Sequence, residues 1–154
     1  MSRAWQNLLT PATGYPERHL SEESEPRFNI SVVFTSVEST LSALREAGRL
    51  ASSLGGHITL VVPQIVPYPL PLDAPPVEAV TTASRFRTVA AGSSVDTTVR
   101  VYMCRDPEAA VLTALAPHSL VVIGGRKRWW PTSEKRLAGK LRRAGHEVIV
   151  AERN

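Results

Sequence analysis

The sequence is poor in the residues that mark several classes of protein. Among 154 residues there is one cysteine, Cys104, which excludes a framework of intramolecular disulfides and any zinc site built from several cysteines. No apolar run reaches the roughly 18 residues that a membrane-spanning helix needs. Residues 1–6 lack the continuous apolar core of a secretory signal. We therefore expect a cytoplasmic protein in a reducing compartment.

Residues for metal binding and nucleophilic catalysis are also few. None of the four histidines has a metal-type partner three or four positions away. They are His19, His57, His118 and His146. Cys104 lies beside Arg105, which leaves open either a redox-sensitive thiolate or a structural cysteine.

What the sequence does have is the composition of an ordinary globular domain, with 43% apolar and 21% charged residues. Residues 1–27 differ, because they contain three prolines and an acidic cluster and show little apolar periodicity. The acidic cluster is Glu22, Glu23 and Glu25, and the apolar residues that could dock as a short turn are Trp5, Leu8 and Leu9. We predict a flexible N-terminal extension over 1–27 and one domain over 28–154.

Strand-like and helix-like patterns alternate throughout the predicted domain. Runs rich in β-branched residues predict strands over 28–34, 57–62, 95–102, 120–123 and 147–151. Apolar residues at helical spacing predict helices over 38–54, 77–91, 106–115 and 132–144. Six prolines between positions 63 and 76 predict a stiff surface loop without a regular element.

This alternation predicts an α/β fold of the Rossmann-like type, an open five-stranded parallel sheet with helices on both faces. With the strand order 3-2-1-4-5, the order reverses between the first and fourth strands. Ligands bind at the carboxyl ends of the strands at such a reversal. The loops 35–37 and 124–133 therefore form the predicted cleft.

The loop 124–133 has the features of an anion site. Gly124 and Gly125 allow a ligand close to the backbone, and three basic residues, Arg126, Lys127 and Arg128, follow them. A helix begins near Ser133 and offers free N–H groups. The alternative is a tight turn with solvated cations, and the sequence leaves both open.

Residues 28–153 resemble the universal stress protein family. The matching stretches are VVFTS at 32–36, RDPEAA at 105–110, LVVIGGR at 120–126 and EVIV at 147–150. The resemblance implies a five-stranded α/β domain that is commonly a homodimer, and many members of the family bind ATP.

The sequence departs from the pattern of the ATP-binding members at two places. They have an aspartate at the end of the first strand, whereas here no carboxylate precedes Glu38. They also have G-x-x-G, nine residues, then G-[S/T]; counted from Gly124, the next two glycine positions are Lys127 and Leu137. The resemblance then implies weak or lost binding of ATP or AMP. The candidate ligand contacts are Thr35, Ser36, Val62, Gly124, Gly125, Arg126, Lys127 and Ser133.

Positive charge is concentrated in one segment. Residues 126–143 contain eight basic residues against Glu134 alone, a net charge of +7, whereas the rest has 10 basic and 13 acidic residues, a net charge of −3. With Trp129 and Trp130, this segment could bind a nucleic acid through phosphate contacts and base stacking. The alternative is a solvated helix face.

Three functions remain open at this point. The first is a non-catalytic stress-response or signalling domain of universal stress protein type, dimeric through strand 147–151, with weak or lost nucleotide binding. The second is an ATP-binding member with slow hydrolysis, which would use Gly124, Lys127 and Ser133. The third is an accessory nucleic-acid binder through 126–143. The hydroxyls near the cleft have no base placed to activate them, so we expect no nucleophilic catalysis.

Overall fold

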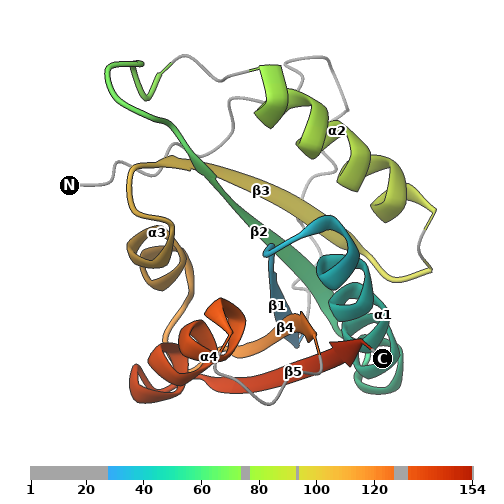
Figure 1. The fold of residues 1–154 in the computed structure, drawn as a ribbon. Helices are drawn as coiled ribbons and strands as arrows, with labels where there is room; N and C mark the ends of the chain where they lie inside the picture. Colours follow the sequence, from blue (N-terminus) through green and yellow to red (C-terminus); the bar gives the residue numbers. More distant parts are fainter. Residues whose placement is uncertain (1–27, 74–76, 93, 127–131, 154) are drawn as a thin grey trace, which may run out of the picture.

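The chain forms one parallel sheet with helices on both faces, as predicted. The computed structural model describes residues 28–73, 77–92, 94–126 and 132–153, and its strands are ordered β3-β2-β1-β4-β5 (Figure 1). The strands are β1 (Asn29–Val33), β2 (His57–Ile65), β3 (Thr97–Cys104), β4 (Leu120–Arg126) and β5 (Glu147–Arg153). The helices are α1 (Val37–Leu54), α2 (Val77–Ala91), α3 (Pro107–Ala114) and α4 (Ser133–Arg143). The predicted extension 1–27 and residues 127–131 lie outside the described residues.

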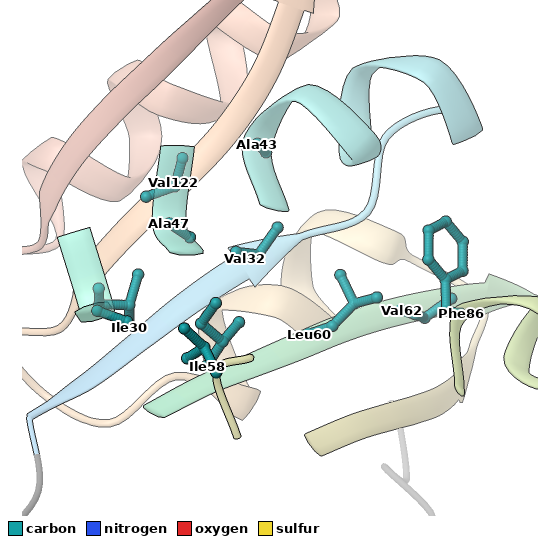
Figure 2. Packing of buried hydrophobic residues seen from close by; sticks show 11 residues of the cluster. Ile30, Val32, Ala43, Ala47, Ile58, Leu60, Val62, Phe86 and Val122 are labelled. Atoms are coloured by element: carbon teal, nitrogen blue, oxygen red, sulfur yellow. The ribbon is translucent and has the colours of Figure 1, made fainter. Parts of the chain in front are cut away.

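Each face of the sheet has its own apolar core. Figure 1 shows α1 and α2 on one face and α3 and α4 on the other. Side chains alternate along a strand, so Ile30 and Val32 of β1 pack towards α1, whereas Val33 packs towards α3 and α4. Figure 2 shows the first cluster, in which Phe86 of α2 lies over β2. The sheet is therefore covered on both sides, and the strand ends are where a ligand can reach it.

Capping residues fix where the helices begin and end. The Ser36 hydroxyl accepts a hydrogen bond from the Ser39 N–H at the start of α1, and Gly55 ends the helix with a φ of 66°. Asp106 accepts from the N–H groups of Glu108 and Ala109 at the start of α3. These signals hold the first turns of the helices at the carboxyl edge of the sheet.

Several strands extend beyond their predicted ends. β2 continues through Pro63 to Ile65, which corrects the prediction that the proline-rich segment has no regular element. Val61 offers its carbonyl to the Phe34 N–H on the β1 side. The backbone N of Pro63, two residues later, faces the same side. β1 has already ended there, so no strand on that side needs a backbone N–H from position 63. β3 is shifted to 97–104 from the predicted 95–102, and it pairs with β2 as far as Cys104.

The strand β4 includes the two glycines that the sequence placed in a loop. Gly124 pairs with Ala151 and Gly125 with Glu152, so β4 and β5 run together to Arg126 and Arg153. The pairing comes from the neighbouring strand, which a local pattern does not show. This corrects the boundary of the predicted loop 124–133.

The rest of the proline-rich segment is held by one side chain. The Arg105 guanidinium donates to the carbonyls of Val66 at 2.5 Å and Leu70 at 2.7 Å. It also lies 3.9 Å from the ring centre of Tyr68. Arg105 thus ties the start of this loop to the end of β3. No helix among the described residues is long and apolar enough to cross a membrane.

Candidate functional site

A cavity of about 210 Å³ lies at the carboxyl edge of the sheet, between the first turns of α3 and α4. Its apolar walls are Val33, Phe34, Val111 and Leu137. Of the eight candidate residues, the structure brings Thr35 and Ser133 to this cavity. The place is the one that the strand order predicts, because β1 and β4 are neighbours at which the order reverses.

Two carboxylates line the cavity. Glu108 lies in the first turn of α3 and Glu134 in the first turn of α4. No lysine, arginine or histidine is found among the described residues that line it. The positive ends of both helices therefore already have negative partners from the protein itself, which disfavours a bound anion.

Both glutamates are also engaged by their neighbours. Glu108 forms an ion pair with Lys140 of α4. Glu134 accepts a hydrogen bond of 3.3 Å from the hydroxyl of Ser133, a candidate ligand contact. The ion pair joins the first turn of α3 to the last turn of α4, whereas the Ser133–Glu134 hydrogen bond lies within the first turn of α4.

The two candidate hydroxyls after β1 serve the fold. The Thr35 hydroxyl donates to the Gly124 carbonyl at 3.3 Å, and the Thr35 N–H donates to the Thr40 hydroxyl at 3.3 Å. Ser36 caps α1 through Ser39. The Thr35 hydroxyl thus holds the β1–α1 turn against β4, and the Ser36 hydroxyl fixes the start of α1.

The candidate glycines have different surroundings. A Cβ on Gly124 would lie 1.7 Å from the Ser39 carbonyl oxygen, so glycine is needed there for α1 to approach β4. A Cβ on Gly125 would meet the Val150 side chain at 3.3 Å. The glycine at 124 thus accommodates a helix of the protein itself, where the sequence predicted the approach of a ligand.

The remaining candidates are not gathered at the cavity. Val62 is 1% exposed and packs in the core under α1 and α2. The Arg126 guanidinium lies 3.9 Å from the Glu38 carboxylate. Both side chains are more than half exposed, so this ion pair contributes little to stability. Lys127 lies outside the described residues.

Comparisons with known proteins show where this architecture occurs. No protein-family model and no curated protein matches the sequence. Among solved structures, the universal stress protein UspA from Lactobacillus plantarum superposes with a TM-score of 0.60 at 16% identity, covering 82% of this chain and 99% of that one. A protein from the universal stress protein family from Burkholderia pseudomallei superposes with a TM-score of 0.56 at 18% identity, covering 79% and 93%. This chain has the universal stress protein fold.

The universal stress protein fold explains how the unpredicted residues Glu108 and Glu134 come together. Each begins the helix that follows a parallel strand, β3 or β4, and such helix starts lie at the carboxyl edge of the sheet. The sequence held the signal, since both glutamates stand in first turns.

Cys104 does not have the surroundings of a reactive thiolate. Cys104 is buried, and burial together with the Asp106 carboxylate raises the pKa of its thiol, which opposes a thiolate. This favours the structural cysteine over the redox-sensitive one. No group of three potential metal ligands exists among the residues that the structure describes.

Part of the basic segment is used within the fold. Lys140 pairs with Glu108, and the Arg142 guanidinium donates to the Val148 carbonyl at 3.1 Å. Arg136 and Arg143 of α4 are exposed. The described part of 126–143 is therefore a helix face with internal contacts as well as exposed cations.

A second cavity lies on the opposite face of the fold, between α1 and α2, and its volume is about 440 Å³. Apolar side chains that line it are Leu41, Leu44, Ile58, Leu60, Phe86 and Val89. Arg45 and Arg49 of α1 line it as well, and no carboxylate does so among the described residues. The hydrogen bond from Arg49 lowers the pKa of the Glu46 carboxyl beside this groove. We call this cavity the α1–α2 groove.

Proposed function

We propose that this protein is a non-catalytic stress-response or signalling domain of universal stress protein type, in which adenine-nucleotide binding is weak or lost. The observation that carries the proposal is the acidic lining of the cavity at the carboxyl edge. The fold supplies the position at which such proteins can bind a ligand, and this chain places Glu108 and Glu134 there.

Electrostatics opposes a nucleotide at this position. The phosphates of ATP carry several negative charges, and two carboxylates at a shared cavity repel them. The cost is greatest where the ligand would displace water, because the effective dielectric constant falls there. A nucleotide would therefore need cations beyond Lys140, which already pairs with Glu108.

The hydroxyl groups near the cavity that could bind a phosphate already have partners within the protein. The hydroxyls of Thr35 and Ser36 hold the β1–α1 turn, and the Ser133 hydroxyl donates to Glu134. A ligand that used them would break these contacts. The proposal thus treats these groups as support for the fold and assigns no catalytic residue.

We also propose a homodimer through β5. This strand lies at one edge of the sheet, beside β4 alone. Ile149 and Val150 remain partly exposed there. An unpaired strand edge favours pairing with a second copy. Light scattering over a range of concentrations tests this part, and a monomer at the highest concentration would contradict it.

Calorimetry with ATP, ADP and AMP tests the nucleotide part. We expect the wild-type protein to bind Mg–ATP no tighter than about 1 mM, equivalent to roughly −4 kcal/mol. Removing both negative charges with Glu108→Gln and Glu134→Gln should tighten binding about tenfold, because the repulsion is relieved. Tight, magnesium-dependent binding to the wild type would contradict the proposal.

A control for each single cavity variant is Glu147→Gln, which also removes one negative charge but at the opposite end of the sheet, where β5 begins. We expect it to leave the ATP affinity unchanged. If the control tightened binding as much as the cavity variants, the effect would come from net charge and not from the lining of the cavity.

A further inference from the structure

The α1–α2 groove combines an apolar floor with two cations on one side. Ile58 and Leu60 of β2 and Phe86 of α2 line the apolar part. Arg45 and Arg49 line the groove from α1, and Arg49 also forms an ion pair with Glu46. The Phe86 ring meets Phe34 edge-on at a centroid distance of 5.5 Å. A group that fits here has apolar side chains and carboxylates.

The described chain starts at the same end of the fold as the groove. The Phe28 carbonyl accepts from the His57 N–H, one residue before Ile58 of the groove. A Cβ on Gly56 would lie 2.4 Å from that carbonyl, so the start of the described chain packs against the turn that follows α1. Phe28 stands two and four residues before Ile30 and Val32, which face α1 and α2. Alternation along the strand directs its side chain to the same face.

The acidic residues before Phe28 and the two arginines of α1 lie at comparable distances from the point where Phe28 meets the end of α1. Glu25 and Glu22 stand three and six residues before Phe28, a reach of about 10 and about 20 Å when extended. Along α1, Arg49 and Arg45 stand six and ten residues before Gly55, about 9 and about 15 Å at the helical rise. The acidic cluster can therefore reach both arginines without crossing the molecule.

Apolar residues further upstream suit the floor of the groove. Trp5, Leu8 and Leu9 have the spacing of one helical face. They stand about twenty residues before Phe28, far enough to reach any part of the groove. A segment joined to the same chain has an effective concentration of the order of millimolar, which favours it over a free partner.

We propose that residues 1–27 bind in the α1–α2 groove of their own chain, with the acidic cluster of Glu22, Glu23 and Glu25 on Arg45 and Arg49. Trp5, Leu8 and Leu9 cover the apolar floor. The groove is then an intramolecular docking site, and the first 27 residues are the segment that it recognises.

Tryptophan fluorescence of the full chain tests this. With Trp129→Phe and Trp130→Phe, Trp5 is the one tryptophan left of three. We expect its emission at shorter wavelength, and its quenching by acrylamide several-fold weaker, than for the same chain in denaturing urea. High salt should reduce this protection because it screens the ion pairs. A Trp5 quenched as strongly as in urea would overturn the proposal.

A charge swap makes the test specific. Arg45→Glu with Arg49→Glu should lower the ratio of bound to released segment about tenfold, as two attractive contacts become repulsive. Adding Glu22→Arg, Glu23→Arg and Glu25→Arg should restore the protection of Trp5. The control is the same reversal at Arg136 and Arg143 of α4, on the other face, which should change nothing. A reversal without effect, or one that the swap does not rescue, contradicts the proposal.

Dilution and mass spectrometry separate the other possible occupants. Protection that disappears on dilution would show that the segment binds a second copy and would overturn the intramolecular site. A carboxylate with an apolar body that co-purifies while Trp5 is unprotected would show a small-molecule site and would overturn it too. Protection that is independent of concentration supports the proposal.

Discussion

The cavity at the carboxyl edge and the α1–α2 groove differ in charge as well as in position. The cavity at the carboxyl edge is about 210 Å³ and is lined by Glu108 and Glu134. The α1–α2 groove is about 440 Å³, is mainly apolar, and is lined by Arg45 and Arg49. The place where the fold favours anions thus has negative side chains, and the positive ones accompany the groove on the other face.

The difference teaches that net charge does not locate a binding site. The sequence has a net charge of +4 and a basic segment of +7 that starts at the predicted ligand loop. In the structure, two residues of that segment are engaged by Glu108 and by the Val148 carbonyl. The helix starts that should attract phosphate have glutamates in their first turns.

The largest effect is expected from Gly124→Ala, which tests whether the glycine at the carboxyl edge is structural. Its Cβ would overlap the Ser39 carbonyl, so α1 would have to move from β4. We expect a loss of at least about 3 kcal/mol in the free energy of unfolding by urea.

The matched variant is Gly139→Ala, a glycine within α4 whose Cβ would meet nothing within 4 Å. It should raise stability by about 0.5–1 kcal/mol through helix propensity. Equal effects of the two substitutions would show that Gly124 is not constrained by α1.

Phe86→Ala tests the floor of the α1–α2 groove. Phe86 is 3% exposed and packs on Phe34 and the strand core, so we expect a loss of about 3–5 kcal/mol. Val89→Ala, at the 44% exposed rim, should cost less than about 1 kcal/mol. Urea unfolding measures both, and a small effect at Phe86 would mean that the groove is not part of the core.

Ser36→Ala and Ser133→Ala separate a cap from an uncommitted hydroxyl at the carboxyl edge. Ser36 caps α1, so its loss should cost about 1 kcal/mol. Ser133 follows the cap Thr132, and its hydroxyl donates to the neighbouring Glu134, so its loss should cost less than about 0.5 kcal/mol. The reverse order would contradict the roles given to these two serines.

The smallest effect concerns pH and Cys104. The folded chain has the higher thiol pKa, so the unfolded state loses this proton first as pH rises. The stability from the neutral thiol is full below about pH 9 and falls as pH rises from there towards the folded pKa. Urea midpoints of wild type should fall more steeply above about pH 9 than those of Cys104→Ala. Parallel curves would contradict a buried, neutral thiol.

The sequence predicted the order and type of every element because apolar patterns are local. Helix 77–91 and strand 147 onward appear where the spacing places them. The sequence did not show that β2 passes through Pro63 or that β4 includes Gly124 and Gly125. Those extensions depend on a neighbouring strand, which lies far away in the sequence.

The strand order predicted the edge of the sheet at which this cavity lies, but not the side chains that line it. The strand order located the cavity, and Thr35 and Ser133 lie at it. Glu108 and Glu134 were missed, because their meeting depends on how α3 and α4 pack across the sheet. Val62 was assigned by position in the family pattern alone, and the alternation of β2 turns it into the core.

Native mass spectrometry of the protein purified from cells tests the central claim, that the cavity at the carboxyl edge does not retain a nucleotide. The account predicts the mass of the chain, or of its dimer, with no adenine nucleotide attached. A stoichiometric adenine nucleotide that is lost when Thr35 and Ser133 are replaced by valine and alanine would contradict it.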